Sequence, residues 1–493
     1  MGRIQDIAIV GASAGGMAAA LALSEKGHRV TLFEKDDGGV PPTNVEAFES
    51  WNRRGTPQLR TSHGFLARLR NILRDRAPSL YKDLLAEGAY EVPIQDLWPP
   101  TMETPPDVLP GDEDFVMLAC RRVTFDWVMR RHLERRQNVE FQTGWEAMGL
   151  VVEHGSGLPR VTGLRLTGPD GAARVHPADL VIDASGRRTI VPRWLEECGV
   201  PRPREESEHC GIFICSRFYR LRPGQGEPAE SRGFLAANLG YMAILLVRGD
   251  SGIFSVMTAT ARDDADLKAM VKPEAFERAV AAIPLFAPWT QPSRSEPLGG
   301  IKSFGDLHNT RREYLVDGKP LILGLIPVGD AFLHGNPAYG RGMTQLFMHA
   351  YLLADALENH PSDLEGLAVE MLEGAERELG RWYRQGLEAD RATAVIRESF
   401  QKLGTCDPSS SEAFANPAVV LQHAMGQASR TDPVVFRAVL RSYNMLDPPA
   451  AFLKNPEVTK RIAAVAQRIA AEKYLPTDGP TREELLGLLG VAA

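Results

Sequence analysis

Three glycines near the start of the chain have a spacing that suits phosphate binding. Gly11, Gly15 and Gly16 lie in the segment GASAGG, with Ser13 and Ala14 among the residues between them. In a dinucleotide-binding turn the first glycine permits a tight bend, and the last lets a helix pack closely on a strand. The middle position brings backbone to a pyrophosphate at the helix N-terminus, and here Ser13 replaces the usual glycine. The segment therefore predicts a dinucleotide site.

An acidic residue follows at the distance that ribose recognition requires. Glu34 ends the next β-rich run, about 20 residues after Gly11, and Lys35 follows it. A carboxylate there accepts hydrogen bonds from the ribose hydroxyls of an adenosine and disfavours a 2′-phosphate. FAD or NAD is therefore expected rather than NADP, although a glycine-rich turn of an ordinary α/β domain would have a similar pattern.

A second glycine-bearing segment, far downstream, indicates which dinucleotide is bound. It follows an apolar run and opens the next helix, and its candidate cofactor-binding residues are Gly329, Asp330, Pro337, Gly340, Gly342 and Met343. A strand-end carboxylate can hydrogen-bond the ribityl chain of a flavin, and a glycine-bearing helix N-terminus presents N–H groups to the electron-rich ring edge. Taken alone, Asp330 could be a helix cap and the glycines a turn. Together, the two segments predict FAD held at both ends.

The elements that must position these segments indicate an α/β fold. Residues 4–10 and 29–33 are β-rich runs around an Ala/Leu-rich helical segment at 17–23, which Gly27 ends. This order is a βαβ unit. Residues 36–61 are rich in Gly, Pro and charge, so we expect a long surface connection there.

Apolar periodicity and breaker residues place the remaining elements. We expect a helix over 64–87 broken at Pro78, a loop over 98–114, a helix over 124–136 capped by Thr124, short strands over 140–183, and a buried parallel strand over 321–328 before a helix over 342–358. Residues 208–260 carry β-branched and aromatic runs with a short link at 248–250, which predicts an antiparallel pair in a sheet covered on both faces. The rest of the chain has a helical pattern, with loops at 405–411 and near Pro448.

Composition excludes several classes of protein. The 493 residues are 44% hydrophobic and 24% charged, as in globular proteins, and a net charge of −7 offers no positive field for nucleic acid. No apolar stretch is long enough to span a membrane and no cleavable leader is visible, so we expect a cytoplasmic protein. The five cysteines are odd in number and never spaced CxxC, which argues against a disulfide framework or a metal site. Cys210 and Cys215 are expected in the core.

Four segments, in the same order, resemble the single-chain FAD-dependent aromatic hydroxylase-like monooxygenases. They are GASAGG with Glu34, RRVTFDWVMRRHL with Arg122, DLVIDASGRRTIVPRWLEECG with Asp183 and Gly186, and VGDAFLHGNPAYGRGMT. Within that superfamily the chain is most similar to bacterial epoxidases that oxidise polyene precursors of polyether antibiotics, in DASGR, PRWL, SRFY and NPAYGRGM. The resemblance implies an α/β protein with a Rossmann-like FAD-binding domain of the glutathione reductase and para-hydroxybenzoate hydroxylase type, an inserted antiparallel-sheet substrate domain and a helical C-terminal region.

The same resemblance implies roles and boundaries. Arg122 would contact the flavin, and the segment with Asp183 and Gly186 would serve both the flavin and the passing NAD(P)H. Many hydroxylases have Asp-Gly and then Gly-Ser where this chain has Asp183-Ala-Ser-Gly186 and Arg188-Thr189, so NADH, NADPH and a separate flavin reductase all stay open as electron donors. The expected domains are an FAD-binding domain at 1–62, 115–200 and 300–365, a substrate domain at 63–114 and 201–299, and a helical region at 366–493.

The chemistry that the resemblance implies is insertion of one oxygen atom from O2 into an apolar or aromatic small molecule through a flavin C4a-hydroperoxide. Both epoxidation and hydroxylation are open, in natural-product or catabolic metabolism. An olefin needs no enzymic base, whereas a phenol is activated by deprotonation. His63, His334 and Tyr339 are the catalytic candidates, with Tyr241 a further one, and a structural role is the simpler explanation for each.

Other activities of the same fold are a FAD-dependent halogenase and an isoprenoid reductase or dehydrogenase. The Trp-x-Trp-x-Ile-Pro segment that marks such halogenases does not occur in this sequence. The substrate is expected between the sheet of residues 208–260 and the flavin, under the segment 98–115. Because successive side chains of a strand point to opposite faces, about half of the apolar side chains of that sheet should line the cleft.

Overall fold

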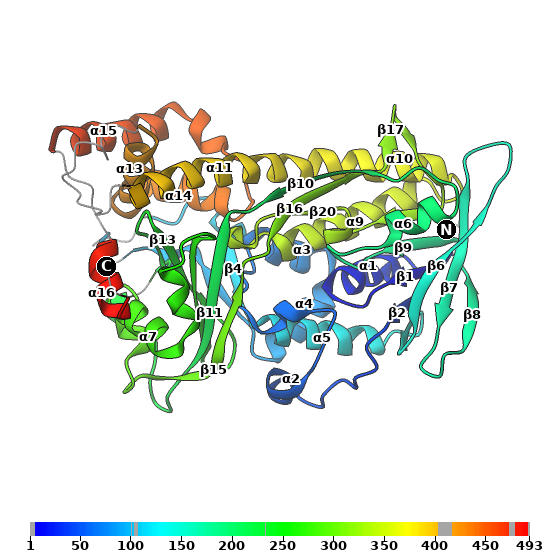
Figure 1. The fold of residues 1–493 in the computed structure, drawn as a ribbon, viewed down its shortest axis with the longest axis horizontal. Helices are drawn as coiled ribbons and strands as arrows, with labels where there is room; N and C mark the ends of the chain where they lie inside the picture. The colour runs from blue at the N-terminus through cyan, green and yellow to red at the C-terminus, as the bar shows by residue number, and fades with distance from the viewer. Residues whose placement is uncertain are drawn as a thin grey trace.

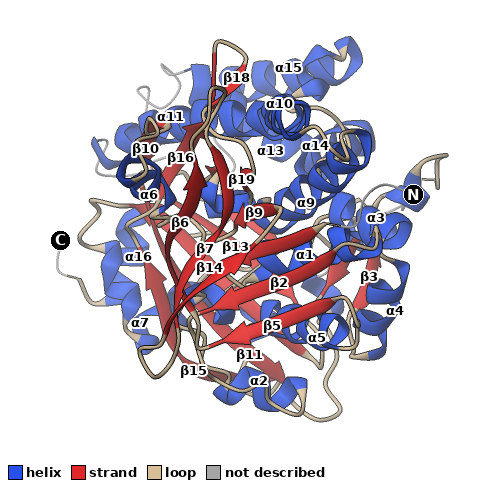
Figure 2. Cartoon of the chain, turned by 90° about the vertical axis from the view of Figure 1, so that its right-hand side faces the viewer, coloured by secondary structure: helices blue, strands red, loops and turns tan. Residues whose placement is uncertain are grey.

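A parallel five-stranded sheet forms the centre of one half of the computed structural model, which describes residues 5–99, 101–102, 107–231, 233–402, 417–472 and 479–491. All neighbouring strands run parallel, in the order β19-β9-β1-β2-β5. The strands are β1 (Asp6–Val10), β2 (Arg29–Glu34), β5 (Val139–Thr143), β9 (Leu180–Asp183) and β19 (Leu325–Pro327). Figure 2 shows them beside α1 (Ala14–Glu25) and α5 (Arg122–Glu134), so the predicted βαβ unit, β1-α1-β2, is confirmed.

Alternation along β1 separates two layers of the core. Ile7 and Ile9 pack against α1, α5 and α9 (Gly342–Asn359) on one face of the sheet. Ala8 and Val10 point to the other face and pack against a three-stranded antiparallel sheet. Its strands are β6 (Glu146–Glu153), β7 (Arg160–Thr167) and β8 (Ala173–Pro177), which confirms the short strands predicted over 140–183. Burial on both faces explains why β1, β9 and β19 are mainly apolar runs.

A second five-stranded sheet, entirely antiparallel, forms the other half of the molecule (Figure 1). Its order is β12-β13-β14-β11-β15, with β11 (Ile212–Leu221), β12 (Ala236–Asn238), β13 (Met242–Arg248), β14 (Ile253–Ala261) and β15 (Ser295–Phe304). The hairpin β13-β14 confirms the predicted antiparallel pair. Cys215 of β11 is buried in this core, and Cys210, just before β11, is buried in a neighbouring cluster; both have free thiols.

Further short strands pair outside the two main sheets. They pair as β3 with β4, as β10-β16-β20, and as β17 with β18. Their bounds are β3 (Tyr90–Pro93), β4 (Val116–Ala119), β10 (Arg204–His209), β16 (His308–Glu313), β17 (Leu315–Val316), β18 (Lys319–Pro320) and β20 (Leu333–His334).

Helices from the C-terminal part of the chain cover one face of the antiparallel sheet. Buried side chains of α7, α8, α13, α15 and α16 share one apolar cluster with β13 and β14. α10 and α11 follow one another along the molecule from the parallel-sheet half to the antiparallel half (Figure 1). The remaining helix bounds are α2 (Asn44–Ser50), α3 (Ala67–Arg76), α4 (Pro78–Ala86), α6 (Val191–Glu197), α7 (Pro273–Ala281), α8 (Ala287–Thr290), α10 (Leu364–Ala375), α11 (Arg381–Lys402), α13 (Pro417–Thr431), α14 (Pro433–Tyr443), α15 (Pro456–Glu472) and α16 (Arg482–Leu489).

Two local expectations from the sequence are wrong, and a third is right in kind but too long. The segment 36–61 is not a plain surface connection, because it forms α2 and a 3-10 turn at Pro57–Arg60 and buries Trp51 and Leu59. Thr124 does not cap α5, which begins two residues earlier; its hydroxyl instead donates to Asp250 at 3.0 Å. The parallel strand expected over 321–328 is limited to β19.

Other local expectations are confirmed or lie outside the described residues. The helical segment 64–87 divides at Pro78 into α3 and α4, and a loop follows α14 near Pro448. The predicted loop at 405–411 and Cys406 lie outside the described residues. Within the part of the chain that the structure describes, no helix combines the length and the apolar character needed to cross a membrane.

Candidate functional site

Two close backbone approaches build the glycine turn after β1. Gly11 has φ +97°, which favours glycine, and a Cβ there would lie 2.8 Å from the carbonyl oxygen of Ala184. A Cβ on Gly16 would lie 1.9 Å from the carbonyl oxygen of Gly11. α1 then begins after Ser13, with no hydrogen bond from a capping side chain and no acidic residue in its first turn. Its N–H groups and positive dipole end therefore suit an anion such as a pyrophosphate.

Glu34 is buried at the end of β2 and contacts the glycine turn. Its Oε2 accepts a hydrogen bond from the backbone N–H of Ala12 at 3.3 Å, and its Oε1 accepts one from Asp36 at 3.2 Å. Arg53 donates to the carbonyl oxygen of Ala12 at 2.6 Å and to Glu34 Oε2 at 3.4 Å. Lys35 is exposed. Sequence reasoning missed Arg53 because its segment was expected to be a surface connection.

A series of polar side chains runs from the buried Arg53, Asp126 and Arg122 to the half-buried His63. Asp126 Oδ2 lies 3.7 Å from Arg53 Nη1, and Asp126 Oδ1 accepts a hydrogen bond from Arg122 Nε at 2.6 Å. Arg122 Nη1 lies 3.2 Å from His63 Nε2, and His63 Nδ1 lies 3.0 Å from the carbonyl oxygen of Thr61. Because a carbonyl oxygen only accepts, Nδ1 carries the proton and Nε2 accepts from Arg122. Burial first, and then the charge of Arg122, lowers the pKa of His63 to about 4, so the ring is neutral at pH 7.

The second glycine-bearing segment meets the first through one side chain of α9. Leu346 Cδ2 lies 3.3 Å from the position that a Cβ on Gly15 would take, and 2.3 Å from that of a Cβ on Gly329. The starts of α1 and α9 therefore lie close together, as the sequence predicts. Gly340 has φ +67°, and α9 begins at Gly342 with no side-chain cap hydrogen bond and no acid in its first turn. The α9 N-terminus is thus a second place where N–H groups can face an electron-rich group.

Asp330 and His334 form a pair beside this second helix start. His334 Nδ1 lies 3.2 Å from Asp330 Oδ2, and the Asp330 side chain is 35% exposed. Burial alone would raise the pKa of Asp330, but the charge and hydrogen bond of His334, with the charges of Arg122 and Arg187, lower it below its usual value. His334 Nε2 is buried and has no hydrogen-bond partner among the described residues. The ionised Asp330 carboxylate, an acceptor, and the His334 ring, which has one nitrogen without a partner in the described part of the chain, therefore lie side by side.

Tyr339 is held by the C-terminal region. Its hydroxyl donates to Asp390 Oδ1 of α11 at 2.6 Å, and Asn336 Nδ2 donates to the same oxygen at 2.8 Å. Asn309 Nδ2 donates to Asp390 Oδ2 at 2.7 Å, and Asn309 Oδ1 accepts from the Asn336 backbone at 2.8 Å. Burial, and then the Asp390 carboxylate, raise the pKa of Tyr339. This network holds the turn Pro337–Tyr339 before α9, and it gives Tyr339 a structural contact rather than a free hydroxyl.

Asp183 stabilises its own loop. The fully buried carboxylate accepts hydrogen bonds from the Ser185 backbone at 3.0 Å, from the Ser185 hydroxyl at 2.6 Å and from Thr189 Oγ1 at 2.6 Å. Burial raises the pKa of Asp183. Gly186 has φ +87° and open space where a Cβ would stand. Gly186 can therefore approach a ligand, whereas the Asp183 side chain is already engaged.

Arg312 joins the third and fourth motif segments and has no signal in the sequence. Its Nη1 donates to the carbonyl oxygens of Asp330 at 3.3 Å and Ala331 at 3.0 Å, and its Nη2 donates to that of Arg187 at 3.1 Å. The residue is buried, and Glu205 accepts from its Nε at 2.8 Å.

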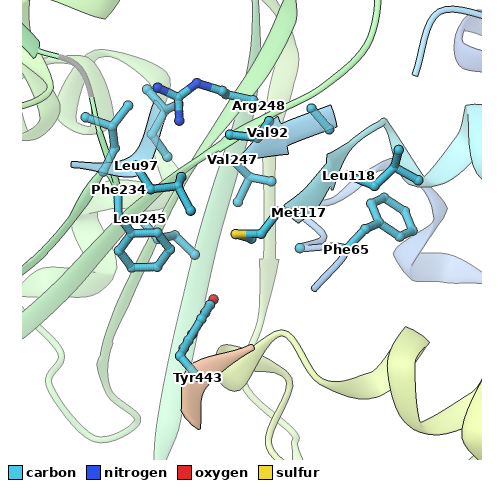
Figure 3. Close-up of a pocket in the computed structure, with 14 residues that line it drawn as sticks. Phe65, Val92, Leu97, Met117, Leu118, Phe234, Leu245, Val247, Arg248 and Tyr443 are labelled. Atoms are coloured by element: carbon cyan, nitrogen blue, oxygen red, sulfur yellow. The ribbon is translucent and has the colours of Figure 1, made fainter. Parts of the chain in front are cut away.

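An apolar pocket opens between β3, β4, β13 and the end of α14 (Figure 3). Leu245 and Val247 of β13 line it, whereas Ile244 of the same strand is buried in the opposite core. The other lining residues are Gly64, Phe65, Val92, Leu97, Met117, Leu118, Ala119, Phe234, Leu235, Leu246, Arg248 and Tyr443. Tyr241, expected near the substrate, is buried elsewhere, and its hydroxyl donates to the carbonyl oxygen of Pro480 at 2.7 Å.

One group of possible metal ligands occurs among the described residues, although none was expected. His209, Asp306 and His308 place their ligand atoms within 4.8 Å of one another. His209 Nδ1 already accepts from the backbone N–H of Gly211 at 2.8 Å, and its Nε2 lies 3.0 Å from the carbonyl oxygen of Gly305. Both ring nitrogens are thus engaged by backbone, which disfavours coordination by His209.

Comparison with known proteins shows the same fold. Residues 9–40 match the family described as an NAD(P)-binding Rossmann-like domain. The chain is 28% identical over 481 residues to Protein Rv3254 of Mycobacterium tuberculosis, covering 91% of each chain. The p-nitrophenol 4-monooxygenase PnpA of Pseudomonas putida superposes with a TM-score of 0.58 at 18% identity, over 91% of this chain and 99% of that one. This chain has a flavin-monooxygenase and halogenase fold.

A halogenase shares that fold to the same degree. The myxobacterial chondrochloren halogenase CndH gives a TM-score of 0.58 at 18% identity, over 97% of this chain and 99% of that one. The predicted fold class is therefore confirmed: a Rossmann-like FAD-binding fold with several antiparallel sheets and a helical C-terminal region. Identity this low leaves the reaction to be argued from the site itself.

The structure brings most of the predicted cofactor residues together. Gly11 lies against Ala184, Gly15 against Leu346 and Gly16 against Gly11, and Glu34 contacts the same turn. At the start of α9, Met343 is buried while Pro337 and Gly342 are exposed. Ala14 is buried in the first turn of α1. Arg53, Asp126, Arg312, Asp390 and Tyr443 are the residues that sequence reasoning missed.

Proposed function

We propose that this chain binds FAD and uses it with O2 to insert one oxygen atom into an apolar or aromatic small molecule. The observation that carries the proposal is the meeting of two uncapped helix starts at Leu346, beside the apolar pocket. A flavin dinucleotide has an anionic pyrophosphate and an electron-rich ring, and each suits one helix N-terminus.

The residues present fit FAD. The α1 N-terminus would hold the pyrophosphate and Glu34 the adenosine ribose, while ionised Asp330 would accept from a ribityl hydroxyl. Two buried polar atoms without partners among the described residues, His334 Nε2 and Thr344 Oγ1, lie in the segment around the second helix start. A bound ribityl or ring group would supply their missing hydrogen bonds.

Bound FAD would supply the electron transfer and the activation of O2. The chain's own contribution is position and environment. The α9 N-terminus and Arg122, which is 5% exposed, stabilise negative charge at the ring end. The apolar pocket walls exclude water and hold the carbon that accepts oxygen next to the cofactor.

The contacts of two candidate bases, His63 and Tyr339, support epoxidation of an olefin over hydroxylation of a phenol. His63 Nε2 accepts from Arg122, and the Tyr339 hydroxyl is engaged by Asp390. Among the described residues that line the pocket there is neither a carboxylate nor an imidazole. An olefin needs no base, which agrees with the resemblance to polyether-pathway epoxidases expected from the sequence segments alone. NAD(P)H or a cytoplasmic flavin reductase would donate the electrons.

The test uses purified protein loaded with FAD, a reductant and isotopically labelled O2, with olefins and phenols as candidate substrates. We expect one labelled oxygen atom in an epoxide, detected by mass spectrometry of the product. A halogenated product in the presence of halide, or a reduced or dehydrogenated product without label, would support the halogenase or the reductase instead.

Cofactor binding is tested separately through Asp330→Ala. Losing a charged hydrogen bond should weaken FAD binding by about tenfold or more, measured by fluorescence titration of the flavin. Unchanged affinity would refute the ribityl role of Asp330, and wild-type protein that takes up no FAD would refute the whole proposal.

A further inference from the structure

Tyr443 places a hydroxyl from the C-terminal region inside the apolar pocket. It is the last residue of α14 and lies far along the chain from β3, β4 and β13, which form the other walls. Figure 3 shows its oxygen pointing into the pocket toward Met117. The ring packs edge-on against Phe234, with centroids 5.1 Å apart.

The end of α14 is fixed to the opposite wall of the pocket. Asn444, which is fully buried, accepts a hydrogen bond through Oδ1 from the backbone N–H of Ala67 at 2.9 Å, and its carbonyl oxygen accepts one from Arg68 at 3.3 Å. These two residues begin α3, directly after pocket residues Gly64 and Phe65. Tyr443 is therefore positioned by a rigid connection rather than by a free chain end.

The same hydroxyl faces the predicted cofactor loop. It lies 3.4 Å from the position that a Cβ on Gly340 would take. Gly340 is the left-handed residue that precedes α9, so the hydroxyl lies where the pocket meets the second helix start.

The Tyr443 hydroxyl is a free hydrogen-bond donor in the pocket. Its hydroxyl forms no hydrogen bond with the described residues, and burial raises its pKa to about 12, so it stays a donor at neutral pH. The other polar side chain of the lining, Arg248, is directed to protein groups: its Nε lies 2.9 Å from both carboxylate oxygens of Glu227, and its Nη1 donates to the carbonyl oxygen of Gly233 at 3.0 Å.

We propose that the Tyr443 hydroxyl is a specificity-determining group that donates a hydrogen bond to a single oxygen acceptor on an otherwise apolar substrate. A carbonyl or ether oxygen held there would orient the molecule with one end at the cofactor loop and its apolar body along Phe65, Leu118 and Val247. The inference rests on the proposed function in that it takes this pocket as the substrate site. It narrows the substrate class to apolar molecules that carry one acceptor.

The test compares two probes that differ only in the acceptor, 2-acetylnaphthalene and 2-isopropenylnaphthalene. Binding of each to the FAD-loaded protein is measured by equilibrium dialysis for the wild type and for Tyr443→Phe. We expect the ratio of the two affinities, ketone over olefin, to fall about tenfold in the variant while the olefin affinity stays unchanged. Because the lost hydroxyl forms no hydrogen bond with the described residues, the thermal unfolding midpoint should not change.

Tyr383→Phe is the matched control, since it makes the same change on α11 at a residue that does not line the pocket, and it should leave the ratio as in the wild type. An unchanged ratio in Tyr443→Phe, or failure of both probes to bind, would overturn the inference. Flavin content is read from the same samples by visible absorbance. Protein that binds no FAD but still shows the Tyr443-dependent ratio of ketone to olefin affinity would refute the proposed function and support the inference.

Discussion

His63 is neutral because of its immediate surroundings. Its Nδ1 donates to Thr61 and its Nε2 accepts from Arg122, so protonation of Nε2 would break a hydrogen bond and place two positive charges together. The same Arg122 pairs with Asp126, which lies near Arg53. Arg122 is thus fixed beside His63, which precedes the pocket residue Gly64, and Arg53 is fixed beside the glycine turn. Sequence spacing alone does not connect these two sites.

The lowered pKa of His63 predicts a pH dependence of stability. Between the unfolded value of about 6.5 and the folded value of about 4, the unfolded chain binds more protons, so the free energy of unfolding falls as the pH drops through this range. The contribution is fully present above pH 6.5 and amounts to up to about 3 kcal/mol. We expect His63→Gln to lose less stability than the wild type between pH 6.5 and 4 in chemical denaturation.

The control for that experiment is His154→Gln, which changes an exposed histidine and should retain the wild-type pH profile. If His63→Gln followed the wild-type curve at every pH, His63 would not be the buried neutral group that its contacts indicate.

At the scale of elements, α11 fixes the turn that precedes α9. Asp390 is the shared acceptor for Asn309 of β16 and for Asn336 and Tyr339 of the turn. A carboxylate with two oxygens can accept from all three donors, and removing it leaves buried donors without partners. The helical C-terminal region therefore shapes the second helix start, which its sequence did not suggest.

Asp390→Ala should weaken both the fold and the cofactor site. Three buried donors lose their acceptor, so the free energy of unfolding should fall by about 3 kcal/mol. FAD affinity should fall as well because the turn before α9 loses its support. Urea denaturation and flavin titration measure the two effects, and Glu388→Ala, an exposed change on the same helix, should alter neither. A destabilised variant with wild-type FAD affinity would show that the Asp390 network does not support the cofactor site.

At the scale of the whole molecule, a buried ion pair joins the two halves. Asp250, in the turn between β13 and β14, is fully buried and accepts from the backbone N–H of Arg121 at 2.7 Å, from its guanidinium and from Thr124. Arg121 immediately precedes α5 and the site residue Arg122. This ion pair therefore fixes the antiparallel sheet to the parallel-sheet half next to the site.

Asp250→Ala leaves a buried guanidinium without its counter-charge and should lower the free energy of unfolding by about 3–5 kcal/mol. Glu197→Ala, which breaks the exposed pair of Arg193 with Glu197, should cost no more than about 1 kcal/mol. Thermal and urea unfolding compare the two. Equal effects from the two variants would mean that the buried pair does not hold the halves together.

The sequence predicts the elements and motifs that depend on near neighbours. The βαβ unit follows from local apolar patterning. Glycine is needed at positions 11 and 16 because a Cβ at either position would meet nearby backbone atoms. It fails over residues 36–61, where polar composition suggested solvent but Trp51 and Arg53 are buried by contacts with distant segments. Composition reports the average environment of a segment, and burial of single side chains depends on what packs against them.

The order of motifs along this chain therefore determined a dinucleotide-binding α/β fold by itself, because strand, turn and helix preferences act over a few residues. Only the tertiary structure decided that Leu346 brings two helix starts together and that Asp390 and Tyr443 from the C-terminal helices reach the site. Such long-range contacts depend on how whole helices and sheets fill space against each other, and residue spacing along the chain carries no direct record of that packing.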